Sequence, residues 1–251
     1  MNTNTKVLLI TGASKGIGAA TARRAAQDGW SVAVHYHQDA FSAAEVCSRI
    51  MMNGGQAHPF SADLRDEYAI DQLFRDVLSH FGQLNGLVNN VGITPVFGRV
   101  DDMNAQRLNE VFSTNVTAAF LCAGQAVKAM STRYGHAGGV IVNISSRAAI
   151  LGSGHRYVDY AASKAALDAL TVGLAKEVAE EGIRVNGVRP GIIRTSIHDK
   201  NGGDAMLQIG QASIPMQRIG EPEEVAESVV WLLSNASSYM TGSFLDVSGG
   251  R

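Results

Sequence analysis

The 251-residue chain has little of several residue types, and each shortage excludes a class of protein. Its two cysteines, Cys47 and Cys122, lie in helix-like stretches without a CxxC pair or a His/Cys cluster at metal-ligand spacing, so we expect neither a disulfide framework nor a metal site. The formal net charge is -2, and no run of Lys or Arg favours a nucleic acid or a membrane surface as partner. No apolar run is long enough to span a membrane, and the first residues show no signal peptide. We therefore expect a cytoplasmic protein that acts on small molecules.

Apolar residues and glycine, by contrast, are plentiful. The hydrophobic fraction is 45% and there are 27 glycines, which is typical of a compact protein with many tight turns. No linker, internal repeat or low-complexity tract divides the chain. The length suits one α/β domain, so we predict that residues 1–251 form a single domain.

Short apolar runs alternate with amphipathic stretches along the chain. This pattern predicts a Rossmann-type α/β fold, a doubly wound parallel sheet of seven strands with helices on both faces. The helical stretches include Asp39 to Asn53, Asp66 to Phe81 and Ala161 to Glu181, each followed by glycine. The predicted strands are Lys6 to Thr11, Ser31 to Tyr36, Gln56 to Ser61, Leu84 to Asn90, Gly139 to Ser145, Ile183 to Val188 and Ser243 to Val247.

One long segment, Gly191 to Pro215, has no regular pattern and follows the sixth predicted strand. Loops of this length inside a compact domain are usually functional, so we expect a substrate loop here. Polar residues and glycine outnumber aliphatic residues between Gly191 and Asp204, which weakly favours a compact polar substrate.

A glycine-rich turn, GxxxGxG, follows the first strand and opens a helix over Ala19 to Asp28. Gly12 permits the tight turn, Gly16 lets the backbone approach a pyrophosphate, and Gly18 lets the helix pack closely on the sheet. The free N–H groups and positive dipole end of the helix favour phosphate binding. We therefore predict a dinucleotide site.

The end of the second strand distinguishes the two nicotinamide dinucleotides. An acid there would bind the adenosine ribose and select NAD, but the strand ends in Tyr36-His37. Lys15 offers a positive charge to a 2′-phosphate, and His37 adds a donor. NADP(H) is the preferred prediction, with NAD(H) as the alternative.

Several further motifs occur in a specific order after the glycine turn. They are Asp63, Asn89-Asn90-Val91-Gly92, Asn115, Ser145-Ser146, Tyr160-Ala161-Ala162-Ser163-Lys164 and Pro190-Gly191-Ile192-Ile193-Arg194-Thr195. With them the chain resembles the short-chain dehydrogenase/reductase family over nearly its whole length. It is most similar to bacterial members of the sugar-dehydrogenase and 3-oxoacyl-(acyl-carrier-protein)-reductase types. Val91 stands where the family often has alanine, and the interval from Ser146 to Tyr160 is one residue longer than in many members, which leaves Ser145 and Ser146 as alternatives.

Reduction of a carbonyl builds negative charge on its oxygen, so the reaction needs a proton donor and neighbours that stabilise this charge. Tyr160 and Lys164 lie four residues apart on one helix face, so we expect the ammonium to lower the pKa of the phenol towards neutrality. Ser146, at the end of the fifth strand, is expected to orient the substrate oxygen, with Ser145 as a turn-capping residue. The resemblance gives Asn115 a supporting role, holding a water next to Lys164; the alternative is an amide bonded to nearby backbone.

The resemblance also implies a cofactor site. Asp63 would contact the adenine through its side chain and Leu64 through its backbone, although Asp63 also fits as an acid near a helix start, where Asp66 is the better cap. Asn90 would approach the ribose or form a turn with Asn89, and Ile193 and Thr195 would bracket the nicotinamide amide and the phosphates. The full predicted set is Gly12, Ser14, Lys15, Gly16, Ile17, Gly18, Tyr36, His37, Asp63, Leu64, Asn90, Val91, Gly92, Tyr160, Lys164, Pro190, Gly191, Ile193 and Thr195.

The predicted activity is hydride transfer between a nicotinamide and a small carbonyl or alcohol. Within enzymes, a sugar-type dehydrogenase and a 3-oxoacyl-thioester reductase are the alternatives, and outside them a catalytically silent dinucleotide-binding regulator. The resemblance, the apolar helix over Ala161 to Val178 and the segment Tyr239 to Arg251 favour a homotetramer. Further candidates for substrate contact are Tyr157, His155, His198, Arg147, Arg156 and Arg194.

Overall fold

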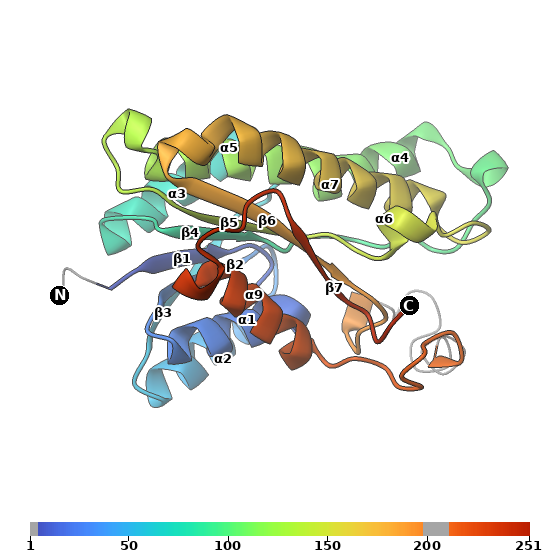
Figure 1. Cartoon of the computed structure of the whole chain (residues 1–251), viewed down its shortest axis with the longest axis horizontal. Coiled ribbons are helices and arrows are strands. Elements are labelled where there is room, and N and C mark those ends of the chain that lie inside the picture. Colours follow the sequence, from blue (N-terminus) through green and yellow to red (C-terminus); the bar gives the residue numbers. More distant parts are fainter. Residues whose placement is uncertain (1–4, 198–210) are drawn as a thin grey trace.

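The computed structural model describes residues 5–197 and 211–251. Seven parallel strands form one sheet in the order β3-β2-β1-β4-β5-β6-β7 (Figure 1), as predicted. The strands are β1 Val7–Ile10, β2 Ser31–Tyr36, β3 Gln56–Ser61, β4 Gly86–Asn89, β5 Gly139–Ile144, β6 Ile183–Pro190 and β7 Phe244–Val247. The main helices are α1 Gly16–Gln27, α2 Ala40–Met52, α3 Glu67–Phe81, α4 Ala105–Phe112, α5 Ala118–Met130, α6 Ala148–Leu151, α7 Val158–Val178 and α9 Pro222–Leu233.

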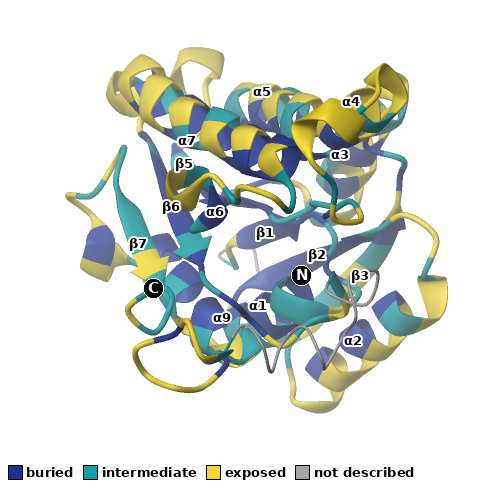
Figure 2. Cartoon of the chain, turned by 90° about the vertical axis from the view of Figure 1, so that its right-hand side faces the viewer, coloured by how far each residue is buried: buried dark blue, intermediate teal, exposed yellow. Residues whose placement is uncertain are grey.

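Two layers of helices cover the sheet. Figure 1 shows α1, α2 and α9 on one face, and α3, α4, α5 and α7 on the other. The central strands between them are largely buried, the edge strands β3 and β7 are only partly so, and the outer surfaces of the helices are exposed (Figure 2). The chain therefore has the three-layer, doubly wound architecture that the sequence predicts.

The strand residues explain why both faces are covered. In β1, Leu8 and Ile10 pack into the core beneath α1, α2 and α9, whereas Val7 and Leu9 pack into the core beneath α3, α5 and α7. Successive side chains of a strand point to opposite faces, so a strand that is apolar throughout needs a helical layer on each side.

Several element boundaries differ from the prediction. The first helix begins at Gly16, not at Ala19, because Lys15 is the extended residue that precedes the helix. Helix α7 begins at Val158, not at Ala161, and ends at Val178 before a 3₁₀ turn to Glu181. Strand β6 extends to Pro190, whose partner is Val247 on β7. Asp66 caps α3 as expected, since its carboxylate accepts from the N–H of Tyr68.

The sheet order reverses between β1 and β4, which are neighbours although far apart in sequence. In open α/β sheets this reversal leaves a crevice at the carboxyl ends of the strands, where ligands bind. The predicted motifs after β1, β4, β5 and β6 all start from this edge. Among the described residues, no helix is long and apolar enough to cross a membrane, and no group of three or more His, Cys, Asp or Glu is placed to hold a metal ion.

Candidate active site

The glycine-rich turn has the backbone that the sequence predicts. Gly12 and Gly16 have positive φ angles of 62° and 57°, a region that favours glycine. A Cβ on Gly18 would lie 2.5 Å from the carbonyl oxygen of Gly12, so this position excludes any side chain. No side chain caps the start of α1, which leaves its first N–H groups to a ligand. The turn is therefore a cradle that fits a pyrophosphate.

Two buried residues that the sequence analysis did not select hold this turn. The N–H of Gly12 donates to Nδ1 of His35 at 3.0 Å, and Nε2 of the same ring lies 3.1 Å from the carbonyl oxygen of Ala62. Burial lowers the pKa of His35 to about 4, so the ring is neutral and its Nε2–H donates to Ala62. Thr11 accepts the N–H groups of Asn90 and Val91 at its hydroxyl, at 2.9 and 3.1 Å. A polar residue inside an otherwise apolar strand was the available signal for His35.

Asn90 and Val91 also contact the glycine turn. The amide of Asn90 donates to the carbonyl oxygens of Thr11 and Gly12 at 2.9 and 3.0 Å, so it braces the turn. The side chain of Val91 lies 3.0 Å from where a Cβ on Gly12 would be. The structure thus brings the motif after β4 against the motif after β1.

Charged and polar side chains gather at the end of β2. Lys15 Nζ lies 3.7 Å from the Asp39 carboxylate, which also caps α2, and His37 lies 3.7 Å from Asp63. Hydrogen bonds from Arg65 hold the pKa of Asp63 at about 2. The Asp63 carboxylate, which was expected to contact the adenine, is therefore bound to Arg65 in this structure. Tyr36 is partly buried, packed against the core, and Leu64 is buried.

Tyr160 and Lys164 lie one turn apart near the start of α7, as predicted. The Ser146 side chain lies close enough to the Tyr160 phenol to lower its pKa, and Nζ of Lys164 lies 5.8 Å from the Tyr160 ring centroid. Ser145 is buried and its hydroxyl donates to the carbonyl oxygen of Lys164 at 3.2 Å. Of the two serines, Ser146 is therefore the one beside the phenol.

The acid–base properties of this pair differ from the expectation. Burial raises the pKa of Tyr160 to about 12, which outweighs the lowering effect of the Ser146 side chain. Burial also lowers the pKa of Lys164 to about 8, and its Nζ donates to the carbonyl oxygen of Ile144 at 2.8 Å. The expected lowering of the phenol pKa is absent here because desolvation dominates, and Ser146 is the group that opposes it.

Asn115 lies in a π-helical turn, Ser113–Thr117, between α4 and α5. Its Oδ1 accepts the N–H of Ile93 at 2.8 Å, and its amide donates to the Ile93 carbonyl and the Ser163 hydroxyl, each at 3.0 Å. A Cβ on Gly92 would lie 3.1 Å from Lys164 Nζ and 3.6 Å from Asn115 Oδ1. The described contacts of Asn115 are thus with nearby backbone and Ser163, while Gly92 keeps space open beside the lysine.

The segment after β6 closes the other side of the glycine turn. The side chain of Thr195 lies 3.3 Å from where a Cβ on Gly16 would be, and Gly191 packs against Ser248. Ile193 is buried and forms an isolated bridge with Gly220. Ile197 accepts a hydrogen bond from the Thr94 hydroxyl at 2.8 Å, so the start of the expected substrate loop lies beside the β4 edge. His198 and residues 198–210 of that loop lie outside the described residues.

Residues 12–251 match the sequence model of a family described as enoyl-(acyl carrier protein) reductase. The chain is 49% identical over 245 residues to an uncharacterized oxidoreductase, YgfF, of Escherichia coli, covering 98% of this chain and 99% of that one. The chain belongs to the short-chain dehydrogenase/reductase family.

Other relatives of this short-chain dehydrogenase/reductase have different named activities. Glucose 1-dehydrogenase 2 of Bacillus subtilis is 37% identical, and the match covers 98% of this chain and 94% of that one. A 3-oxoacyl-(acyl-carrier-protein) reductase of Synechocystis is 36% identical, and the match covers 98% of this chain and 96% of that one. A crystal structure of a dehydrogenase/reductase from Sinorhizobium meliloti superposes with a TM-score of 0.88 at 36% identity, covering 98% of this chain and 94% of that one. The family uses a nicotinamide dinucleotide cofactor, and the glycine cradle fits one.

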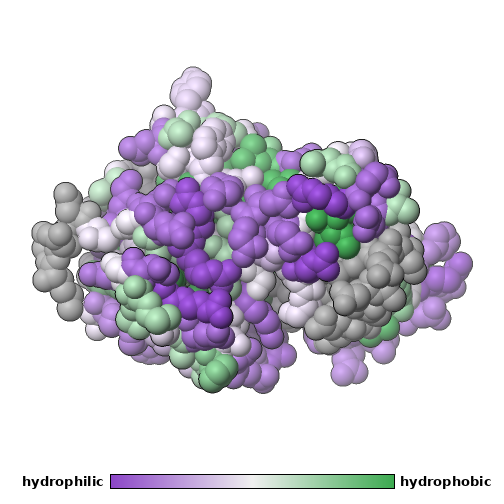
Figure 3. Space-filling model, turned by 90° about the horizontal axis from the view of Figure 1, so that it is seen from below, coloured by the Kyte–Doolittle hydropathy of each residue, from purple (hydrophilic) through white to green (hydrophobic). Residues whose placement is uncertain are grey.

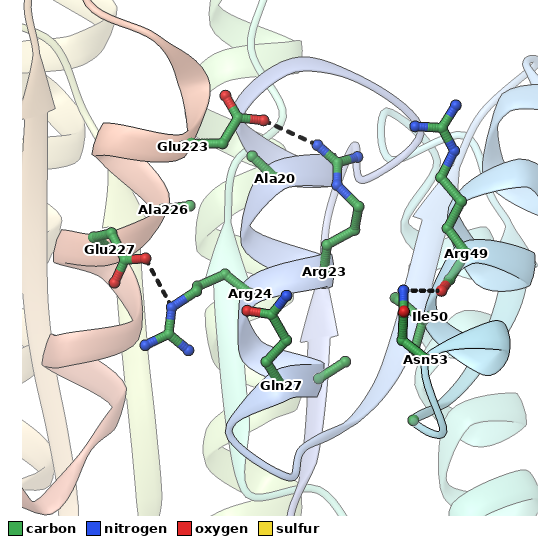
Figure 4. A pocket seen from close by; sticks show the side chains of 12 residues that line it. Ala20, Arg23, Arg24, Gln27, Arg49, Ile50, Asn53, Glu223, Ala226 and Glu227 are labelled. Carbon is green, nitrogen blue, oxygen red and sulfur yellow. Dashed lines mark hydrogen bonds and ion pairs between the residues drawn. The ribbon is translucent and has the colours of Figure 1, made fainter.

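A separate hollow of about 250 Å³ lies between α1, α2 and α9, away from this site. In Figure 4, Arg23 reaches Glu223 and Arg24 reaches Glu227, so ion pairs join α1 to α9 across it. Hydrophilic residues cover most of the face of the protein on which α1, α2 and α9 lie (Figure 3). No predicted site residue lines the hollow, and the two ion pairs occupy Arg23 and Arg24 in its lining.

Proposed function

We propose that this protein is an NADP(H)-preferring oxidoreductase that transfers a hydride between nicotinamide and a small carbonyl or alcohol. One observation carries the proposal: the Ser146 side chain lies close enough to Tyr160 to lower the pKa of its phenol, and Lys164 lies one turn further along α7, at the sheet edge that holds the glycine cradle. Such a trio is unnecessary in a catalytically silent dinucleotide-binding regulator, which needs only the cradle.

The chain's own residues would divide the chemistry as follows. When bound, the nicotinamide supplies or accepts the hydride. In reduction, Tyr160 donates its phenolic proton to the substrate oxygen as negative charge builds there, and in oxidation it accepts the proton back. Ser146 donates a hydrogen bond that orients this oxygen. Lys164, as an ammonium below pH about 8, stabilises the phenolate that Tyr160 becomes, and Asn115 holds the neighbouring Ile93 backbone.

The preference for NADP(H) over NAD(H) rests on Lys15 and His37. Lys15 is 63% exposed at its side chain and stands between the glycine turn and α2, where a 2′-phosphate would lie. The opposing acid, Asp39, is partly engaged as the cap of α2. The remaining predicted cofactor residues, from Gly12 to Thr195, would hold the dinucleotide along the crevice.

The remaining assignments are part of the same proposal. The chain is one cytoplasmic domain with a substrate loop at residues 191–215, and it forms a homotetramer without nucleic acid or membrane partners. Its substrate is of the sugar type or the 3-oxoacyl-thioester type, because its relatives include proteins named for each activity.

The deciding experiment measures NADPH and NADH binding and then cofactor consumption against ketones, aldehydes, sugars and acyl thioesters. Tyr160→Phe is expected to abolish turnover and keep NADPH binding, while the control Tyr134→Phe, an exposed tyrosine, keeps both. Lys15→Gln is expected to lower NADPH affinity about tenfold and leave NADH binding unchanged, with exposed Lys128→Gln as control. Equal turnover in Tyr160→Phe and wild type would overturn the assignment of the acid, and tight binding without any turnover would favour the regulator.

A further inference from the structure

A series of aromatic rings leads away from the reactive phenol. The Tyr157 ring meets the Tyr160 ring edge to face, with centroids 5.5 Å apart, and lies 5.4 Å from the Phe97 ring. Phe97 is 37% exposed and comes from the loop between β4 and α4. A substrate whose carbonyl meets Tyr160 therefore has an aromatic wall on one side.

Aliphatic side chains on the loop that carries Phe97 and on the short helix α6 are also exposed. Val96 precedes Phe97 and is 58% exposed, while Ile150 and Leu151 on α6 are 55% and 47% exposed. Helix α6 begins two residues after Ser146. Exposed apolar groups on segments adjacent to a polar reaction centre fit a binding site for an apolar ligand.

Arg156 places a positive charge at the far end of the ring series. Its guanidinium lies over the Phe97 ring, 5.5 Å from the centroid, and the residue is partly buried. Other arginines at this end of the sheet each pair with a carboxylate: Arg65 with Asp63, Arg99 with Asp101, Arg107 with Asp159, Arg147 with Asp246 and Arg194 with Glu221. Arg156 has no carboxylate partner among the described residues.

The backbone holds Arg156 in this position. Its carbonyl oxygen accepts the N–H of Gly98 at 2.7 Å, which ties the loop before α7 to the loop that carries Phe97. Two residues just before it, Ser153 and His155, have positive φ angles of 50° and 61°, which side chains other than glycine rarely adopt. Strained backbone of this kind is often found where a loop positions a ligand-binding group.

We propose that the substrate is an apolar carbonyl compound, or the matching alcohol, which carries an anionic group that Arg156 binds. The inference rests on the proposed oxidoreductase function and specifies its substrate. The carbonyl lies at Tyr160 and Ser146, the apolar body lies along Tyr157 and Phe97, and the anion meets the unpaired guanidinium. It departs from the compact polar substrate that the composition of residues 191–204 favours, because the described walls are aromatic and aliphatic.

The test uses aryl ketones that carry a carboxylate at increasing distance from the carbonyl, each paired with its uncharged amide. NADPH consumption gives kcat and KM, and calorimetry measures binding to the protein saturated with NADPH. Wild type is expected to prefer at least one carboxylate to its amide by about tenfold or more in kcat/KM. Arg156→Gln is expected to raise KM for that carboxylate about ten- to a hundredfold and to change the amide less than about twofold, with Arg156→Lys intermediate.

Arg99→Gln is the matched control, since it removes an exposed arginine of the neighbouring loop that is already paired with Asp101. A wild type that does not distinguish carboxylate from amide, or an Arg156→Gln variant that loses both equally, would overturn the inference. Calorimetry separates this result from failure of the proposed function. Carboxylate binding that depends on Arg156 supports the inference even without NADPH consumption, whereas absent consumption across the wider substrate panel counts against the oxidoreductase itself.

Discussion

His35 connects the glycine turn to the core, and its burial makes the turn sensitive to acid. The pKa of His35 is lowered from 6.5 to about 4 in the folded chain, so unfolding takes up a proton between these values. The contribution of the neutral His35 ring to the free energy of unfolding is fully present above pH about 6.5. It decreases by about 3 kcal/mol in total as the pH falls towards 4. Denaturant unfolding followed between pH 7 and 4 should show this decrease. The free energy of unfolding of His35→Gln should depend less on pH over this range. The control His136→Gln changes an exposed histidine and should show the same pH dependence as wild type.

Lys164 sets the pH range of the proposed reaction. Burial lowers the pKa of Lys164 to about 8, and the negative charge of Asp168 on the next turn of α7 partly opposes this. The ammonium is present below pH 8 and is lost above it, so kcat/KM for carbonyl reduction should fall as the pH rises through about 8. Asp168→Asn removes the opposing charge, so the fall should move to lower pH. Exposed Asp101→Asn is the control, and a profile that does not move in Asp168→Asn would contradict the role of Asp168.

Spacing predicts the site residues whose relationship is local, whereas Asn115 and Thr195 are expected only from the family resemblance. Tyr160 and Lys164 are one helical turn apart, and Gly12, Gly16 and Gly18 belong to one short turn between a strand and a helix. Their spacing in the sequence is therefore enough to place them relative to one another. His35 was missed because its partners, Gly12 and Ala62, lie 23 and 27 residues away in sequence. The direction of the Tyr160 pKa was wrong because desolvation depends on burial, which spacing does not determine.

At the scale of elements, a buried ion pair fixes the start of α7. Arg107 on α4 donates to both carboxylate oxygens of Asp159, at 2.7 and 3.3 Å, and the Asp159 side chain is fully buried. Asp159 also accepts the N–H of Tyr160 at 3.0 Å. The pair therefore positions the helix turn that carries the phenol.

Removing one partner should be costly. Arg107→Met leaves the Asp159 charge buried without a partner, so the free energy of unfolding should fall by about 3 kcal/mol, and kcat should fall with it because Tyr160 loses its support. The Arg107→Met/Asp159→Asn double variant should lose less than the sum of the single variants, as a double-mutant cycle by denaturant unfolding would show. The exposed pair Arg99–Asp101 provides the comparison. Additive losses in the cycle would mean that the two residues do not act together.

The order of the elements was predictable, whereas some of their ends were not. The central strands β1, β2, β4 and β5 are mostly apolar because helices cover both faces, and this pattern is visible without a structure. The first turn of α7 is held by the distant Arg107, which pairs with Asp159, a contact that lies 52 residues apart in sequence. The extension of β6 to Pro190 depends on pairing with β7, which lies more than fifty residues later in the chain.

At the scale of the whole molecule, the outer layer of α4, α5 and α7 has the surface of an interface. Phe120 on α5 is 48% exposed, Leu108 on α4 38%, and Val172 on α7 37%. Exposed large apolar groups on adjacent helices indicate a protein partner, and the proposed homotetramer supplies a second copy.

Light scattering tests this assembly. Wild type should have the mass of a tetramer, and Phe120→Asp should give a smaller species because it introduces a charge into the apolar surface. Phe41→Asp, on α2 in the opposite layer and 82% exposed, should remain tetrameric. A Phe120→Asp variant of unchanged mass would place the interface elsewhere.

The strand order also has a consequence during synthesis. β1 is made first, yet its neighbour on one side is β4, and the cradle next to it is closed by Thr195. A chain leaving the ribosome can pair β1, β2 and β3 early, but it has no crevice until β4 emerges and no complete site until β6 has been released. The complete cofactor site therefore exists only in a nearly finished chain. Cofactor binding can stabilise the fold late in synthesis, but it cannot help the first strands to pair.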